Sequence, residues 1–367
     1  MGNARNLADN LPPAGGFANA LTGALGNRNI IINGAMNVSQ RQTSSSNVGN
    51  KYVLDRFFVY RQNASSTYTC SQNSVTDLEG FSNSLKMLCS TADTSVASNE
   101  QVYIQHKIEG RDCQRLAKGH GSDALPMTLS FYVKTNKTGL YTVRIYDRDN
   151  ARNVSGSYTV ANTNWNRYSV TFPADASGKL DDDSNSSLEF FWHLVQGSDT
   201  TAGSLQTTWA GVSDSGAATG QVNFADALNN SWEITGIQLE VGSEATPFEH
   251  EHHDTTLSKC QRYCHVFKTD SQNGIRNIHQ DRLTTTYIGN YFMPREMRVI
   301  PTVTQIGMDR VHKPGIRYDT ISSGPNFYFI HTQGFVTTIT VTNNDVDSQT
   351  AYFGAVSGGT VTADAEL

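Results

Sequence analysis

The sequence is short of charge. Charged residues make up 17% of its 367 residues, and the net charge is −6, whereas about 25% is usual in globular proteins. A protein that binds a phosphate backbone would show a basic patch, so no nucleic-acid partner is expected. No run approaches the ~18 apolar residues that span a bilayer, and no basic region followed by an apolar run opens the chain. Neither membrane insertion nor a secretory signal peptide is predicted.

Cysteine is scarce and odd in number, which argues against a disulfide framework and favours reduced thiols. The one close pair is Cys260 and Cys264. Thiolates and imidazoles are the usual zinc donors, but this spacing matches no common structural zinc pattern, and burial of the thiols is favoured. A metal at this pair stays an open alternative. The nearby imidazoles belong to His250, His252, His253 and His265.

Catalytic motifs are absent as well. The chain has no G-x-S-x-G elbow, phosphate-binding loop, H-E-x-x-H or Rossmann glycine pattern. We therefore predict no enzyme, no catalytic residue and no cofactor, and assign no residue to ligand binding. Residues 181–183 are three aspartates that lack calcium-loop spacing and are expected to be solvated. Trp165, Trp192 and Trp232 are expected in a core, and Trp209, among polar residues, is the best candidate for exposure.

Hydroxyl and amide side chains supply the polarity instead, since Asn, Ser and Thr account for 102 residues. Apolar and polar residues alternate in segments such as 129–134 and 168–172, as in half-buried strands. Many short strands with turn-rich connections predict an all-β protein built on an antiparallel jelly-roll β-sandwich. Strands are expected at 29–32, 52–54, 57–60, 84–89, 102–108, 127–134, 141–147, 157–160, 167–172, 188–195 and 232–241.

Four segments are predicted along the chain. Residues 1–28 have scattered apolar residues and no core of their own, which suits an N-terminal arm that anchors to another protein. Residues 29–250 form the jelly roll, and residues 251–268 hold one short linking helix over 254–263, capped by Asp254 or Thr255. Residues 269–367 form a smaller C-terminal β-sandwich domain, with strands expected at 284–292, 302–306, 327–332, 335–341, 351–356 and 360–363.

Two flanking segments carry a family resemblance. NIIINGAMNVSQR (29–41) with YVLDRF (52–57), and the segment 232–263, resemble bacteriophage tail-fibre and virion structural proteins that contain a carbohydrate-binding-module-like jelly roll. The resemblance implies a homotrimeric tail-fibre, receptor-binding component that would be made in the bacterial cytoplasm and located on the virion. Its arm would contact another virion protein, and a host cell-surface glycan is a further expected partner. A capsid head-fibre or decoration protein is the alternative.

Two other functions rank lower. A polysaccharide depolymerase would need paired carboxylates in a groove and usually a repetitive β-helix, and the sequence shows no such repeat. A free carbohydrate-binding module would be expected with a signal peptide or a fused catalytic domain.

If the arm is held on the particle, residues 269–367 point outward, so we expect them, and not the jelly roll, to contact the host. Their aromatic residues are dense: Phe327, Phe329 and His331 should share one strand face, with Tyr328 and Ile330 on the other.

Overall fold

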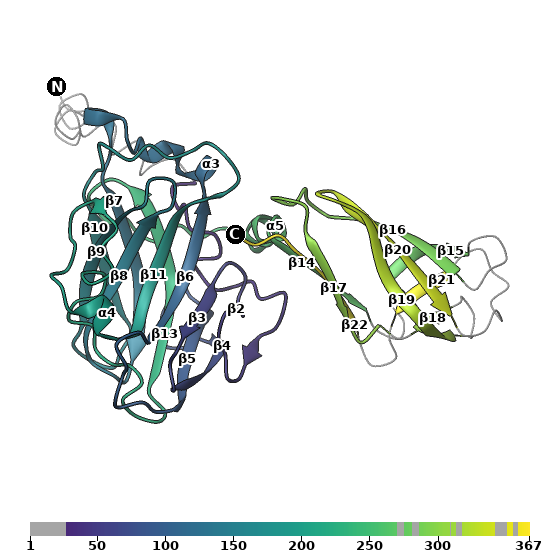
Figure 1. Cartoon of the computed structure of the whole chain (residues 1–367), viewed down its shortest axis with the longest axis horizontal. Helices are drawn as coiled ribbons and strands as arrows, with labels where there is room; N and C mark the ends of the chain where they lie inside the picture. The colour runs from purple at the N-terminus through teal and green to yellow at the C-terminus, as the bar shows by residue number, and fades with distance from the viewer. Residues whose placement is uncertain are drawn as a thin grey trace, which may run out of the picture. The chain divides into compact units, whose positions relative to one another are not determined.

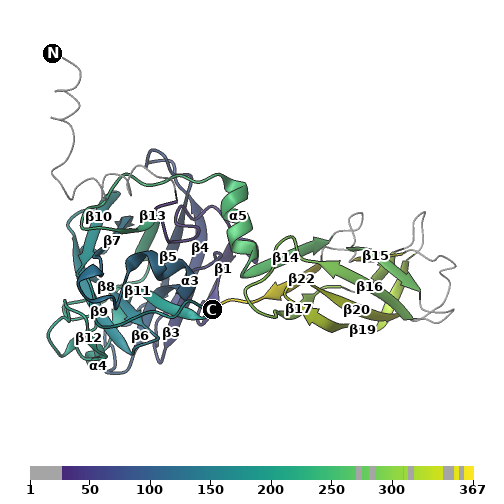
Figure 2. The same ribbon diagram turned by 90° about the horizontal axis from the view of Figure 1, so that it is seen from above.

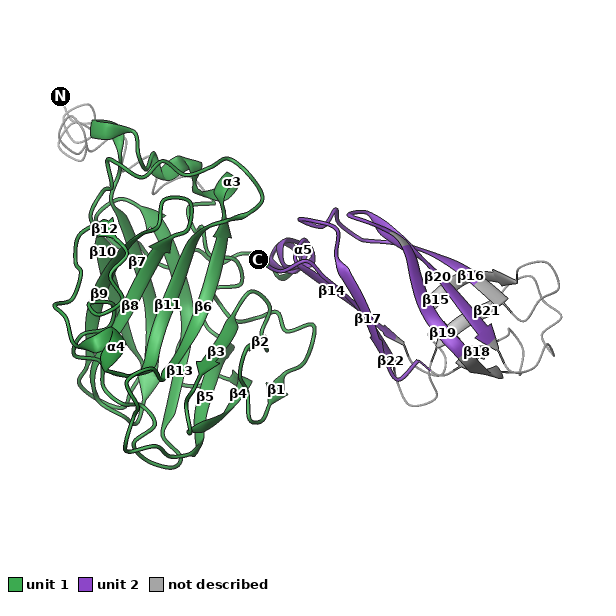
Figure 3. Ribbon diagram, viewed as in Figure 1, with its two compact units in different colours: residues 1–253, 367 green, residues 254–366 purple. Residues whose placement is uncertain are grey.

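The computed structural model describes residues 27–269, 275–280, 286–308, 310–312, 318–341, 351–354 and 359–367. The arm predicted for residues 1–28 therefore lies almost wholly outside the described residues. The chain divides into two compact units, residues 1–253 with Leu367 and residues 254–366 (Figures 1 and 3). Within the described part of the chain, no helix has the length and hydropathy to cross a membrane.

Unit 1 is built on two antiparallel sheets (Figure 2). The six-stranded sheet has the order β1 (Ser44–Ser45), β4 (Thr67–Ser74), β5 (Asn83–Thr91), β13 (Ser231–Val241), β7 (Met127–Thr135) and β10 (Asn166–Phe172). The seven-stranded sheet has the order β12 (Ala210–Gly211), β9 (Arg152–Val160), β8 (Gly139–Asp147), β11 (Ser186–Gln196), β6 (Gln101–Glu109), β3 (Phe58–Gln62) and β2 (Lys51–Tyr52). The prediction of an all-β, jelly-roll-type sandwich is confirmed.

One hydrophobic core joins the two sheets. Trp192 on β11 and Trp232 on β13 are fully buried in it, as expected, together with Phe131 on β7 and Ile104 on β6. These strands alternate because successive side chains point to opposite faces, so each strand gives one row to the core and one to the outer surface. Among the described residues of this unit, the α-helices α3 (Gly110–Cys113) and α4 (Ser198–Thr201) are single turns in the connections.

The prediction of a strand at 29–32 is wrong. Ile30 and Ile31 are buried, but the segment forms a turn in which the Met36 amide donates to the Asn33 carbonyl oxygen at 2.9 Å. The Ile30 amide still donates to the Leu239 carbonyl oxygen at 3.0 Å, but the Ile31 amide donates to the Asn29 side chain and interrupts a ladder. In the turn that follows, Asn33 Nδ2 donates to the Val38 carbonyl oxygen and Oδ1 accepts from the Val38 amide. Strand β4 was missed because its sequence, TYTCSQNS, is largely polar and only Tyr68 and Cys70 of its side chains are fully buried.

Unit 2 opens with α5 (His253–Gln261), which agrees closely with the helix predicted over 254–263. The rest of the 251–268 segment was assigned wrongly to the helical linker, because β14 (Cys264–Thr269) is a strand that pairs with β22 (Gly359–Asp364). A third strand, β17 (Thr302–Ile306), completes this sheet. The C-terminal domain is all-β, as expected, but where a second β-sandwich was predicted its other strands close a barrel. The barrel order is β15 (Ile275–Gln280), β16 (Thr286–Phe292), β20 (Gly334–Val341), β19 (Tyr318–His331), β18 (Arg310–His312) and β21 (Ala351–Gly354).

The aromatic strand of unit 2 does not alternate as predicted. Tyr328 is 48% exposed, whereas Ile330 packs against the core formed by Tyr291, Phe335 and their neighbours. The pairing of β19 with β20 shifts register between Tyr328 and His331, and this irregularity places Tyr328 and Ile330 in different environments. Of the strand's other aromatic side chains, Phe327 also packs against the core, and that of Phe329 lies outside the described residues.

Candidate functional site

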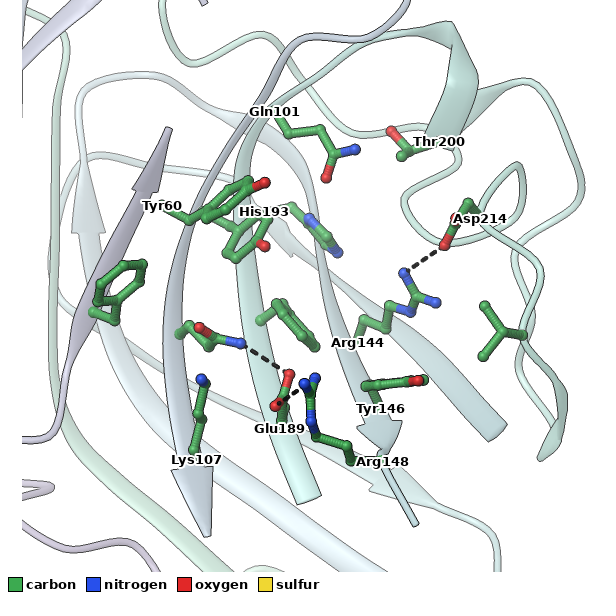
Figure 4. Close-up of a pocket in the computed structure, with 15 residues that line it drawn as sticks. Tyr60, Gln101, Lys107, Arg144, Tyr146, Arg148, Glu189, His193, Thr200 and Asp214 are labelled. Carbon is green, nitrogen blue, oxygen red and sulfur yellow. Dashed lines mark hydrogen bonds and ion pairs between the residues drawn. The ribbon is translucent and has the colours of Figure 1, made fainter. Parts of the chain in front are cut away.

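Unit 1 carries a groove of about 470 Å³ on the outer face of the seven-stranded sheet (Figure 4). Strands β3, β6, β8 and β11, which are adjacent in that sheet, supply most of its lining, and α4 and the segment after β12 complete it. The lining residues are Phe58, Tyr60, Gln101, Tyr103, Gln105, Lys107, Arg144, Tyr146, Arg148, Glu189, Phe191, His193, Thr200, Val212 and Asp214.

Strand register arranges these side chains in rows across the sheet, because residues paired across antiparallel strands project to the same face. One row runs Tyr60, Tyr103, His193. The next runs Phe58, Gln105, Phe191, Arg144, and a third runs Lys107, Glu189, Tyr146. Each row therefore combines aromatic or aliphatic surface with groups that form hydrogen bonds.

Aromatic rings form the centre of the groove. The rings of Tyr60 and Tyr103 stack with centroids 4.5 Å apart and planes 13° from parallel, and Phe191 meets Tyr103 edge-on at 5.0 Å. Burial raises the pKa of Tyr103 above its usual value, so its hydroxyl stays protonated at neutral pH. The groove thus offers flat apolar surface together with a hydroxyl that can donate and accept.

Two arginines of the groove are each paired with a carboxylate. Arg144 lies 3.1 Å from Asp214, and Arg148 lies 3.4 Å from Glu189 (Figure 4). Glu189 also accepts a hydrogen bond from Gln105 at 3.0 Å. The network fixes the orientation of these side chains and leaves the groove with little unbalanced charge.

His193 is the most buried titratable group of the groove lining that lacks a polar partner. It is 3% exposed, and neither ring nitrogen has a hydrogen-bond partner among the residues that the structure describes. Its ring lies 5.8 Å from Tyr103 and 6.4 Å from Phe191. Burial, reinforced by the positive charge of Arg144, lowers the pKa of His193 to about 3. The imidazole is therefore neutral at physiological pH, with one donor and one acceptor unused.

The residues singled out from the sequence lie elsewhere. Trp209 is only 9% exposed, so its expected exposure is wrong: Nε1 donates to the Pro173 carbonyl oxygen at 2.8 Å, and the Lys118 ammonium lies 4.6 Å from the ring centroid. Trp165, expected in the core, is half-buried at the surface and donates to Asp77 at 2.9 Å. Both differences arise because partners far away in sequence cover one indole and leave the other open.

Two groups of residues were considered as metal ligands from the sequence: the cysteine pair with its nearby histidines, and the aspartates 181–183. Across the described ranges, no three His, Cys, Asp or Glu side chains are placed to hold a metal ion. Cys260 and Cys264 are both buried, while His250 packs against Phe81 and Phe248. In the 181–183 run, the Asp183 carboxylate caps the backbone amide of Asn185 at 2.9 Å.

No groove residue was assigned from the sequence, although a signal was present. In the predicted strands at 57–60, 102–108, 141–147 and 188–195, the positions between core residues hold Tyr, Arg, Gln, His and Glu instead of the Ser and Thr common elsewhere. Each strand alone reads as ordinary surface. Only the adjacency of four strands that are distant in sequence brings these positions together.

The architecture and the groove define unit 1 as a jelly-roll β-sandwich with an aromatic and polar groove on one sheet. No family model matches the sequence, and no curated protein matches it. Among solved structures, the chain is distantly similar to carbohydrate-binding modules. A module designated CBM4 and the family 11 module of Clostridium thermocellum, solved with a β-1,3-1,4-mixed-linked tetrasaccharide, have TM-scores of 0.30 and 0.29. Each is 10% identical, over 57% of this chain and 99% of the module.

A cyclase from Fischerella sp. TAU is similar to the same degree. Its TM-score is 0.32 at 10% identity, over 59% of this chain and 98% of the cyclase. At such scores the likeness concerns the fold and assigns neither a ligand nor an activity to this chain.

Proposed function

We propose that this protein is a virion adhesion component whose jelly-roll unit binds a polysaccharide chain in the groove. The observation that carries the proposal is the arrangement of three rows of aromatic and hydrogen-bonding side chains on one sheet face. A sugar ring has an apolar face of C–H groups and a rim of hydroxyls. Aromatic rings bury the former, and fixed amide, carboxylate and guanidinium groups bind the latter.

The groove is suited to binding without cleavage. A glycosidase needs one protonated carboxyl group and a second carboxylate on opposite sides of the scissile bond. The two carboxylates of this groove, Glu189 and Asp214, are each engaged with an arginine. We therefore propose a binding protein and not an enzyme, and the absence of new reducing ends after incubation with a bound polysaccharide is the expected result.

The virion location, the homotrimer and the anchoring arm rest on the sequence resemblance of 29–41, 52–57 and 232–263. Within this proposal, the jelly roll contacts the host surface glycan, and this replaces the expectation that residues 269–367, and not the jelly roll, do so. A capsid decoration protein remains the alternative, and it would use the same groove for a glycan.

The test is a glycan array of bacterial surface polysaccharides followed by calorimetry on the full chain. Replacing Tyr60 or Arg144 by Ala should weaken binding by about ten- to a hundredfold, the effect of truncating a central contact residue. The matched controls lie on the outer face of the other sheet: Tyr132→Ala for the tyrosine and Arg167→Ala for the arginine.

Tyr132 is partly exposed and Arg167 is exposed, and both belong to the six-stranded sheet, which does not carry the groove. The controls should bind as the wild type does. Equal losses in groove and control variants, or no polysaccharide bound at all, would remove the groove as a glycan site.

A further inference from the structure

The unpartnered imidazole of His193 gives the groove a chemical preference. We infer that the groove selects uncharged sugar units and that His193 anchors one of their hydroxyl groups; this inference rests on the proposed glycan binding. Buried polar atoms in folded proteins nearly always have hydrogen-bond partners, so two orphan nitrogens on one ring call for a specific reason. Here the ring lines a groove, and a bound ligand supplies that reason.

A hydroxyl is the group that matches a neutral imidazole, since it can either accept from the ring N–H or donate to the other nitrogen, and a sugar carries several hydroxyls that can fill both roles. The Arg144 Nε, also buried without a partner, is a second unused donor in the same lining. A carboxylate or sulfate group has only acceptor atoms. If such a group occupied the place of the hydroxyl at His193, it could accept from the ring N–H but would leave the acceptor nitrogen buried and unpaired, which costs about 1–3 kcal/mol.

The cations of the groove do not favour an acidic ligand either. Arg144 and Arg148 are already paired with Asp214 and Glu189, and Lys107 donates to the backbone oxygen of Leu367 at 2.8 Å. An acidic sugar that approached either arginine through its paired nitrogen would have to displace a carboxylate that belongs to the protein. Uncharged sugars bind without breaking these pairs.

The first test observes the wild-type protein, so that folding of a variant is not at issue. ¹⁵N-histidine NMR follows His193 during titration with two matched pairs of probes: methyl β-D-glucoside with methyl β-D-glucuronide, and methyl β-D-galactoside with methyl β-D-galacturonide. At least one neutral glycoside should shift both ring nitrogens of His193, with a response at least about fivefold weaker for its uronide. No shift with either neutral glycoside, or an equal response to the uronides, overturns the inference.

Variants separate this inference from the proposed function. Using the polysaccharide with the strongest array signal, His193→Phe should lose about tenfold in affinity, and His193→Gln, which keeps a donor and an acceptor, should recover part of it. Asp214→Asn releases Arg144 and should strengthen uronide binding severalfold, whereas Asp77→Asn, in the connection between β4 and β5, should not. If Tyr60→Ala abolishes binding while His193→Phe does not change it, the groove is the glycan site but His193 is not its anchor.

Discussion

A buried cluster of charged side chains in unit 1 gives the sharpest test of what stabilises this fold. The Lys118 ammonium contacts the carboxylates of Asp147 and Asp175, the latter at 3.0 Å, and Arg152 binds Asp175 in a bidentate pair at 2.8 and 2.9 Å. Burial by itself would raise the pKa of Asp175, but hydrogen bonds from Arg152 and Lys118 lower it below its usual value. A Cβ on Gly178 would collide with the Lys118 ammonium, so the surrounding chain leaves no spare room.

We expect Lys118→Met to lower the free energy of unfolding by about 3–5 kcal/mol, because it leaves two buried carboxylates without their shared cation. The Lys118 side chain is 1% exposed, so water cannot replace the ammonium. The matched control is Lys134→Met. Lys134 also pairs with an aspartate, Asp77, but is 36% exposed, and such a pair contributes about 0–1 kcal/mol.

Urea unfolding followed by tryptophan fluorescence measures both variants, and Trp209 beside Lys118 reports on the cluster directly. Adding Asp147→Asn to Lys118→Met should restore part of the loss, because it removes one uncompensated charge. The deficit should also shrink below about pH 5, where the unpaired carboxylates can take up protons. Equal losses in the Lys118 and Lys134 variants would refute the reasoning.

Four further predictions concern stability, assembly and adhesion. Burial lowers the pKa of His193 to about 3 and that of His106 well below its usual value. Below about pH 6.5 the unfolded chain therefore binds more protons than the folded one, and each histidine should lower the free energy of unfolding by up to about 1.4 kcal/mol per pH unit. In His193→Gln, the plot of urea midpoint against pH should be flatter between about pH 7 and 5. A plot unchanged from the wild type would contradict this. Deleting residues 1–28 should leave a folded protein that no longer joins virions, and normal occupancy of the truncated chain would show that the arm is not the anchor. Light scattering should give a homotrimer, whereas a stable monomer of 40.2 kDa would exclude it. Groove variants such as Tyr60→Ala should reduce adsorption of the phage, whereas a loss seen only when residues 269–367 are exchanged would make the C-terminal domain the adhesive unit.

The sequence alone determined most of the strands of unit 1, because alternation of apolar and polar residues is a local property set by the geometry of an extended chain. The segments predicted at 102–108 and 188–195 lie within β6 and β11. Local patterns failed where side chains took over the role of the backbone. In 29–32, a segment that looks like a strand, the Ile31 amide binds the Asn29 side chain, and the register shift in β19 breaks the expected alternation at Tyr328.

Only the tertiary structure decided where the candidate site lies. Tyr60, Tyr103 and His193 stand in one row because β3, β6 and β11 are neighbours in a sheet, although the chain runs through other strands between them. The same holds for Trp209, which is buried by Pro173 and Lys118 from distant segments. Strand formation depends on neighbours in the sequence, whereas a binding surface depends on which strands pair. Pairing is settled by burial of a shared core that no single segment contains.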